Sequence, residues 1–311
     1  MNLEDENGLQ RRRLMLALAG CGAMALVGPR FAAASPQANR KPIPSSGELL
    51  PVIGMGSWLT FDVGDNLRAR AARTQVLQAF FDHGGALIDS SPMYGSSQEV
   101  IGHALAQLRN KSTLFAATKV WILGKGFGIR QMEDARRLWG VPRFDLMQVH
   151  NLLDWETHLE TLKAWKAEGR VRHIGVTTSH GRRHDEMAQL MQSEPLDFVQ
   201  FTYNILDREA EQRLLPLAAE RRIAVIVNRP FQRGSLFDRV RGKPLPSWAA
   251  EFDCANWAQY LLKFVVSHPA VTCAIPATSR VDHMVENMGA GFGRLPDAAM
   301  RRRMVAHFER L

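Results

Sequence analysis

Cysteine is scarce in this sequence, with 3 residues in a chain of 311. That number excludes a small scaffold held together by several disulfides, so stability must come from buried apolar side chains. Hydrophobic residues make up 46% of the chain, which is enough for a large core. We expect Cys273, inside the apolar run 271–275, to be buried, and nothing indicates a disulfide between it and Cys254.

Long apolar runs are also lacking. The N-terminal apolar stretch, residues 14–27, is interrupted by two glycines and is shorter than the roughly 20 residues that span a bilayer. It follows the arginines at 11–13 and precedes small residues at 32–34, which is the order of an export signal with cleavage after Ala34. The adjacent arginines resemble those of a twin-arginine signal.

These features predict that residues 1–34 are an export signal peptide and that export machinery recognises the precursor. The mature protein is then periplasmic, without stable insertion in a membrane. One alternative stays open, because residues 18–21 resemble a lipoprotein cleavage box that would leave Cys21 lipidated. Apolar residues continue past Cys21, which favours a place for it inside the apolar segment of the signal.

Acidic residues are fewer than basic ones, 31 against 39, and the formal net charge is +8. The basic excess is spread along the chain, apart from the arginine triplets at 11–13 and 301–303. We expect the second triplet to form a solvated face of a terminal helix, and we expect no nucleic-acid binding. We expect some of these basic residues to bind the phosphates of a cofactor, which is a smaller anionic partner than a nucleic acid.

The dinucleotide fingerprint of a doubly wound sheet is incomplete, because Leu59 stands where a third glycine should follow Gly54 and Gly56. Instead, short apolar runs alternate with segments of helical period, such as 155–165, 209–221 and 256–267. The eight candidate strands are residues 51–56, 86–89, 113–119, 145–150, 173–177, 197–201, 223–227 and 271–275.

Eight strands that alternate with helices predict an α/β fold, a single-domain (β/α)8 TIM barrel over residues 48–311. The Pro- and Ser-rich residues 35–47 are expected to form a linker or N-terminal arm.

Four chemically active side chains lie at or just past the ends of candidate strands. Asp89 and Tyr94 follow one strand, Lys119 ends the next and His150 ends the one after that. In barrel enzymes the loops after the strands build the active site. A phenol, an ammonium group, a carboxylate and an imidazole together form an acid–base device suited to a carbonyl group. We therefore predict a catalytic site at these four positions.

From Val52 onward the chain resembles the aldo/keto reductase family. The resemblance rests on the order and spacing of several segments, which are residues 89–95, 119–121, 145–151, 169–176, 200–204 and 275–287. It implies a barrel enzyme dependent on NADP(H) that reduces aldehydes or ketones to alcohols. Its substrate is then a small carbonyl compound.

The resemblance also implies a role for each catalytic position. Tyr94 would be the general acid, although its unperturbed pKa near 10 makes it a weak one. The ammonium group of Lys119 would lower that pKa, since an opposite charge favours the phenolate. Asp89 would hold Lys119 in place. His150 would donate a hydrogen bond to the carbonyl oxygen and orient the substrate.

A cofactor site follows from the same resemblance. Glu286 and Asn287 would contact the adenine, and Ser279, Arg280 and His283 would hold the ribose 2′-phosphate, which favours NADP over NAD. The remaining predicted cofactor-binding residues are Gly56, Ser57, Trp58, Thr177, Thr178, Gln200, Asn228, Arg229, Pro230, Phe231, Gly234 and Leu236.

Two positions depart from the family pattern. Asn228 stands where an aromatic residue usually stacks on the nicotinamide, and Thr178 stands where an asparagine is common. We expect both changes to alter how tightly the nicotinamide is bound and where its ring lies.

Other readings of the sequence stay open. Some relatives of this fold are regulatory or redox-sensing subunits that hold the cofactor and turn over slowly, and a purely structural periplasmic protein would hold no cofactor. We expect no metal site. His180 and His184 have a spacing that a metal can use, but no carboxylate or cysteine completes the set.

Overall fold

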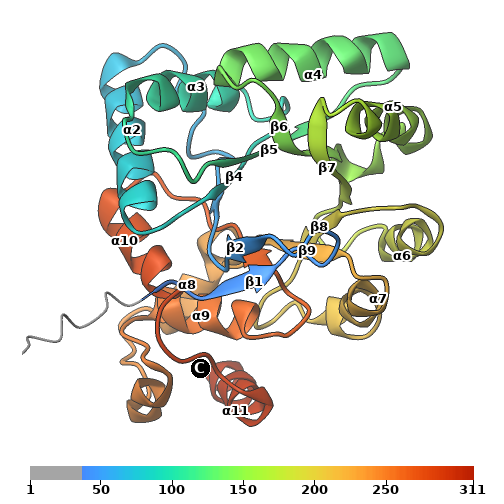
Figure 1. The fold of residues 1–311 in the computed structure, drawn as a ribbon. Coiled ribbons are helices and arrows are strands. Elements are labelled where there is room, and N and C mark those ends of the chain that lie inside the picture. Colours follow the sequence, from blue (N-terminus) through green and yellow to red (C-terminus); the bar gives the residue numbers. More distant parts are fainter. Residues whose placement is uncertain (1–36) are drawn as a thin grey trace, which may run out of the picture. The chain divides into compact units, whose positions relative to one another are not determined.

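The computed structural model describes residues 37–311, and the predicted export signal at 1–34 lies outside the described residues. Eight parallel strands hydrogen-bond in the order β10-β9-β8-β7-β6-β5-β4-β3, so each strand pairs with its neighbours in the chain. Helices surround the strands on the outside (Figure 1). The predicted single-domain (β/α)8 barrel is confirmed.

All eight barrel strands arise from the apolar runs that the sequence indicates, because strands buried on both faces are apolar throughout. Their bounds are β3 Met55–Gly56, β4 Leu87–Asp89, β5 Phe115–Val120, β6 Phe144–Val149, β7 Val171–Thr177, β8 Phe198–Thr202, β9 Ala224–Asn228 and β10 Cys273–Ala274. The helices are α2 Leu67–Asp82, α3 Ser97–Gln107, α4 Lys125–Trp139, α5 Trp155–Ala167, α6 His184–Ser193, α7 Leu214–Glu220, α8 Ser235–Val240, α9 Trp257–Val266, α10 Val281–Gly289 and α11 Ala298–Glu309.

The first and last strands close the barrel through parallel bridges, one of them between Gly56 and Ala277. Close packing at this seam explains the glycine at position 54. A Cβ atom there would lie 2.8 Å from the carbonyl oxygen of Leu87 and 3.0 Å from Sγ of Cys273. The two glycines that resemble part of a nucleotide-binding fingerprint therefore stand where two backbones approach closely.

An antiparallel hairpin of β1 (Arg40–Pro42) and β2 (Leu49–Pro51) covers the N-terminal ends of the barrel strands (Figure 1). Its residues Ile43 and Leu50 are buried in the cluster that fills the barrel interior. Lys41 Nζ donates to three backbone carbonyl oxygens between α9 and β10, at 2.7 to 2.8 Å. Part of the segment expected to be a linker or arm is therefore a strand, held by pairing and by these bonds.

One predicted helix is divided. Residues 209–221 form a 3-10 turn, η2 (Glu209–Glu211), followed by α7. Pro216 lacks the N–H that a continuous helix from Glu209 would need, so the helix begins anew with the proline in its first turn. The other two predicted helices match α5 and α9. Asn256 caps α9 by accepting a hydrogen bond from the backbone N–H of Gln259.

The arginine triplet on α11 forms only in part the solvated face that the sequence predicts. Arg302 and Arg303 are exposed, but Arg301 is buried. Its guanidinium group donates to the carbonyl oxygen of Phe264 and to Glu211, where the N–O distance is 2.9 Å. A buried guanidinium group needs such partners, and here they anchor α11 to the barrel.

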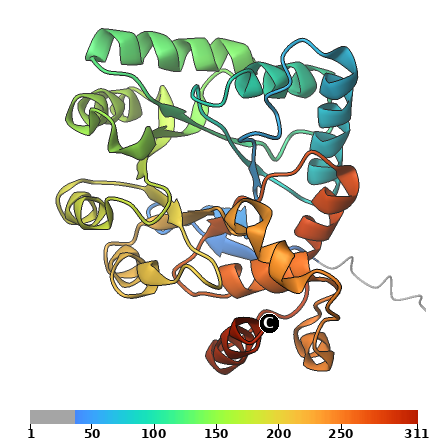
Figure 2. The same ribbon diagram turned by 180° about the vertical axis from the view of Figure 1, so that it is seen from behind.

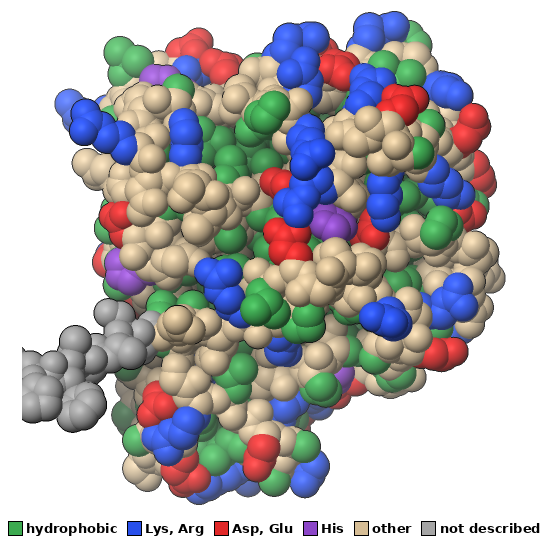
Figure 3. Space-filling view, viewed as in Figure 1, with side chains coloured by type: hydrophobic (Ala, Val, Ile, Leu, Met, Phe, Trp, Pro, Cys, Tyr) green, Lys and Arg blue, Asp and Glu red, His purple; other side chains and the backbone are tan. Residues whose placement is uncertain are grey.

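Charged side chains are dispersed over the face that carries the hairpin, with Lys and Arg interleaved with Asp and Glu (Figure 3). This face therefore carries no continuous basic patch. None of the described helices is long and apolar enough to cross a membrane. Cys254 and Cys273 are both free, and Cys273 is fully buried as predicted.

Candidate active site

A cavity of about 730 Å³ opens among the loops that follow the barrel strands. These loops lie at the end of the barrel opposite the hairpin, and this end faces the viewer in Figure 2. The volume is within the range of roughly 300–1,000 Å³ that is typical of small-molecule sites. Asp89, Tyr94 and His150 line the cavity, and Lys119 lies fully buried next to it. The structure thus brings together the four residues that the sequence indicates.

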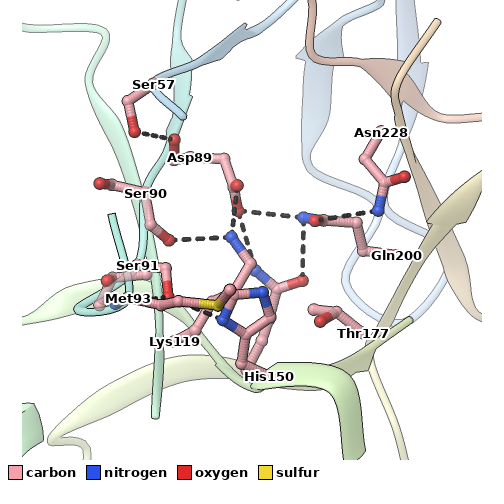
Figure 4. Close-up of polar contacts among 12 residues, drawn as sticks. Ser57, Asp89, Ser90, Ser91, Met93, Lys119, His150, Thr177, Gln200 and Asn228 are labelled. Atoms are coloured by element: carbon pink, nitrogen blue, oxygen red, sulfur yellow. Dashed lines mark hydrogen bonds and ion pairs between the residues drawn. The ribbon is translucent and has the colours of Figure 1, made fainter. Parts of the chain in front are cut away.

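Asp89, at the end of β4, is the centre of a buried polar network (Figure 4). Lys119, from the adjacent strand β5, places its Nζ atom 2.5 Å from Asp89 Oδ2 and 2.9 Å from the carbonyl oxygen of Ser90. The other carboxylate oxygen accepts hydrogen bonds from the amides of Gln148, at 3.1 Å, and Gln200, at 3.0 Å. A buried ion pair needs such additional hydrogen bonds, because each charge has lost its hydration.

A tight turn carries Tyr94 back over the end of β4. The backbone N–H of Tyr94 donates to the carbonyl oxygen of Ser91 at 3.0 Å, with Pro92 at the second turn position, where its fixed φ suits the turn. Gly95 follows with φ of 55°, and a Cβ atom there would clash with the Asp62 carboxylate. Lys119 Nζ lies 5.2 Å from the centre of the Tyr94 ring.

His150 directly follows β6 and begins a short 3-10 turn, η1 (His150–Leu152). Asn151 and Leu152 have φ of 53° and 54°, a left-handed conformation that is strained for leucine. His150 Nδ1 lies 2.8 Å from the hydroxyl oxygen of Ser91. The imidazole meets the Tyr94 ring edge to face, with 5.6 Å between ring centres.

Burial sets the protonation states of these groups. It raises the pKa of Tyr94, and the Asp89 carboxylate raises it further. The net pKa shift of Tyr94 is therefore opposite to the lowering that the resemblance implies, and the ammonium group of Lys119 is paired with Asp89. Burial also lowers the pKa of Lys119, against the opposing effect of Asp89. The pKa of His150 falls from 6.5 to about 2, through burial and then the charge of Lys119.

Most of the predicted cofactor-binding residues line the same cavity. They are Gly56, Ser57, Trp58, Thr177, Thr178, Gln200, Asn228, Arg229, Pro230, Phe231, Gly234, His283, Glu286 and Asn287. Thr178 Oγ1 and Arg229 Nη1 are buried and have no hydrogen-bond partner among residues 37–311. Buried polar atoms are rarely left unpaired, so this wall fits a large polar ligand such as a dinucleotide.

Three predicted cofactor residues do not line the cavity. Leu236, on α8, is buried in the hydrophobic core. Ser279 and Arg280 lie just before α10, outside the cavity wall. The exposed Arg280 guanidinium group pairs with the carboxylate of Asp282 on the first turn of α10, with Nε 2.9 Å from Oδ1. A 2′-phosphate would have to compete with this carboxylate for Arg280.

Asn228, at the end of β9, is held by the ends of β8 and β7 on one side of it. Its Oδ1 accepts a hydrogen bond from the hydroxyl of Thr202 at 2.7 Å, and its Nδ2 donates to the carbonyl oxygen of Thr178 at 2.9 Å. The position that usually carries an aromatic ring thus links β7, β8 and β9. Gln200 Oε1 lies 3.5 Å from Asn228 Nδ2 (Figure 4).

Sequence reasoning missed several residues at this site. Ser91 and Gln148 lie inside the motifs that predicted the site, yet only their contacts with His150 and Asp89 reveal a role. Arg233 also lines the cavity and lies over the ring of Trp58, with 4.5 Å between the guanidinium carbon and the ring centre. The sequence signal that could have identified Arg233 is its place in the glycine-containing loop of residues 228–236.

Within residues 37–311 no group of three His, Cys, Asp or Glu side chains could hold a metal ion. His180 lies in a loop with φ of 63°, whereas His184 begins α6, so the two do not share a helix face.

Comparisons with known proteins agree with this geometry. Residues 52–303 match the sequence model of the Aldo/keto reductase family. Methylglyoxal reductase YeaE of Escherichia coli (strain K12) is 28% identical over 255 residues, which cover 80% of this chain and 88% of the relative. Aldo-keto reductase YhdN of Bacillus subtilis (strain 168) is 25% identical over 230 residues, which cover 67% and 69%.

Solved structures give the same result. An aldo/keto reductase from Klebsiella pneumoniae, in complex with NADP and acetate, superposes with a TM-score of 0.69 at 25% identity, over 84% of this chain and 93% of that one. An aldo-keto reductase from Bacillus halodurans superposes with a TM-score of 0.71 at 19% identity, over 88% and 96%, which supports the fold alone. Because the family match runs from the first barrel strand to α11 and includes every strand end of the site, this chain belongs to the aldo/keto reductase family.

Proposed function

We propose that this chain is an NADP(H)-dependent oxidoreductase that reduces aldehydes or ketones to alcohols, with Tyr94 as general acid. The observation that carries the proposal is the convergence of Tyr94 and His150 on one cavity, beside the buried pair of Asp89 and Lys119. A carbonyl oxygen that receives hydride develops negative charge, so it needs hydrogen-bond donors and then a proton.

Each catalytic side chain has a separate task in this reaction. When bound, the nicotinamide cofactor supplies the hydride. Tyr94 keeps its proton, because its pKa is raised, and it can therefore donate to the carbonyl oxygen. His150 is neutral and donates a second hydrogen bond to that oxygen. Lys119, held by Asp89, places a positive charge near the phenolate that forms when Tyr94 gives up its proton.

The cofactor assignment rests on the polar wall of the cavity. Arg229 and Arg233 suit the pyrophosphate, and Glu286 and Asn287 on α10 suit the adenine. Arg280, near the N-terminus of α10, suits a 2′-phosphate once it is released from Asp282. The Klebsiella pneumoniae relative in complex with NADP supports the same choice.

The substrate is proposed to be a small carbonyl compound that enters along an apolar rim. Leu59 and Met93 line the cavity while remaining well exposed, and Trp121 lies beside His150 with 6.4 Å between ring centres. Because one relative is a methylglyoxal reductase, methylglyoxal is the first substrate to test.

The deciding experiment measures repeated turnovers of NADPH with methylglyoxal and a panel of aldehydes. Tyr94→Phe keeps the ring but removes the proton donor, so the rate should fall by about 10²–10⁴-fold. NADPH binding, followed by fluorescence, should barely change. Lys119→Met should also slow the reaction, and the two losses should not add, since both residues act on one proton.

Two results would count against the proposal. Near-full activity of Tyr94→Phe on a good aldehyde would refute the role of Tyr94. Tight cofactor binding without repeated turnover would instead favour a regulatory or redox-sensing subunit.

We also propose that residues 1–34 direct export to the periplasm, with the twin-arginine pathway as the route. The support is the order of basic, apolar and small residues in the sequence. Replacing both Arg11 and Arg12 with Lys should strand a folded precursor in the cytoplasm, as fractionation would detect. Export that persists through the general secretory route would refute the pathway. The mass of the mature N-terminus distinguishes cleavage after Ala34 from lipidation at Cys21.

A further inference from the structure

The hydroxyl group of Ser91 faces the catalytic imidazole from the turn that also positions Tyr94. Its oxygen lies 2.8 Å from His150 Nδ1, and both side chains are almost completely buried. The contact connects the loop after β4 with the end of β6, two strands that are not adjacent in the barrel. It is the direct polar contact of His150 Nδ1 within the described part of the chain.

The direction of this hydrogen bond can be derived from the groups around it. The Ser91 oxygen already accepts a hydrogen bond from the backbone N–H of Met93, at 3.3 Å. Its hydroxyl hydrogen needs an acceptor, and His150 Nδ1 is the acceptor that residues 37–311 provide. The hydroxyl therefore donates to Nδ1. A neutral imidazole carries one proton, so that proton is on Nε2.

We propose that Ser91 is a positioning residue that fixes His150 in the tautomer with its proton on Nε2. The inference rests on the proposed carbonyl reduction, because that reaction needs a hydrogen-bond donor at this position. The opposite tautomer would present a lone pair to the carbonyl oxygen and would repel the negative charge that develops there. Ser91 thus selects the imidazole form that can stabilise the product alkoxide.

Two observations strengthen the assignment. The environment disfavours imidazolium, since burial and the charge of Lys119 lower the pKa of His150, so the choice lies between the two neutral tautomers. The Ser91 backbone is also immobilised, because its carbonyl oxygen accepts the Tyr94 N–H at 3.0 Å within the turn. The hydroxyl oxygen is therefore held at one place relative to the ring.

The first test is a long-range ¹H–¹⁵N NMR spectrum of the mature protein labelled on histidine, with the His150 signals assigned from a His150→Asn variant. We expect the pattern of an imidazole with its proton on Nε2. A pattern with the proton on Nδ1 overturns the proposal. This measurement requires no turnover, so it succeeds or fails independently of the proposed reductase activity.

The second test compares Ser91→Ala with Ser90→Ala. Ser90 is the matched control, because its adjacent hydroxyl is also buried but has no hydrogen-bond partner among the described residues. Ser91→Ala should give a mixture of tautomers and lower kcat/KM for the aldehyde by roughly 3- to 10-fold, the effect of one lost hydrogen bond. NADPH affinity should stay unchanged. Ser90→Ala should keep the Nε2 tautomer.

The outcomes separate the two proposals. An unchanged tautomer and unchanged kcat/KM in Ser91→Ala overturn the role of Ser91, even if the protein is an active reductase. An Nε2 tautomer that Ser91→Ala disturbs supports that role, even if no aldehyde is turned over and the proposed function fails.

Discussion

At the scale of single residues, the contacts of a charged group matter more than its type. Arg280 has the position expected of a 2′-phosphate ligand, yet its guanidinium group is paired with Asp282. Lys119 is likewise paired with a carboxylate, that of Asp89, and the net pKa shift of Tyr94 in this structure is upward. Both side chains must be judged together with the carboxylate that each one contacts.

The pairing of Arg280 leads to a prediction about cofactor choice. Arg280→Ala should weaken NADPH binding by about tenfold, since a charged hydrogen bond to phosphate is lost, and should leave NADH binding nearly unchanged. Asp282→Asn should have the opposite effect and tighten NADPH binding, because it frees the guanidinium group. Fluorescence titration with both cofactors measures these changes. Equal effects on NADPH and NADH would rule out a phosphate role for Arg280.

At the scale of secondary-structure elements, a few buried polar anchors hold the outer segments to the barrel. Lys41 ties the β1–β2 hairpin to backbone carbonyl groups between α9 and β10. Arg301 ties α11 to Phe264 and to Glu211. Each anchor makes several hydrogen bonds through one side chain, so its loss should destabilise the whole element that it holds.

The arginine triplet of α11 provides a matched test of this anchoring. Arg301→Ala should lower the free energy of unfolding by about 2 kcal/mol, because buried hydrogen bonds to a charged group are lost. Arg302→Ala, in the exposed neighbour, should change it by less than about 0.5 kcal/mol. Urea unfolding of the three proteins measures the difference. Similar losses for both variants would mean that Arg301 is no anchor.

At the scale of the whole molecule, the barrel buries ionisable groups that the unfolded chain exposes. Burial and nearby positive charges lower the pKa of His150 from 6.5 to about 2 and that of His268 from 6.5 to about 4. Below pH 6.5 these two histidines therefore bind protons in the unfolded chain that they do not bind in the folded barrel. Stability must fall as the pH falls through this range.

This argument predicts acid sensitivity. Between pH 7 and pH 5, His150 alone should reduce the free energy of unfolding by about 2 kcal/mol, and His268 should act in the same direction. Unfolding curves at several pH values would measure the slope. His150→Asn removes one titrating group, so its slope should be smaller. An unchanged slope in that variant would contradict the buried neutral state of His150.

The sequence by itself determined the fold class and the location of the candidate site. Eight apolar runs separated by helical segments specify a parallel barrel, because burial on both faces requires continuous apolar strands. In such a barrel the strand ends meet on one face, so Asp89, Lys119 and His150 had to lie close together. Pro92 and Gly95 are residue types that favour turns, and they lie within and directly after the turn that returns Tyr94.

Only the tertiary structure decided how these groups are charged and paired. The raised pKa of Tyr94, the bond from Ser91 to His150 and the burial of Arg301 each depend on neighbours from distant segments. Desolvation and hydrogen bonding act through space over a few ångströms, so sequence order carries no record of them. Periodicity is local and can be predicted, whereas the environment of a buried polar atom exists only after the chain has folded.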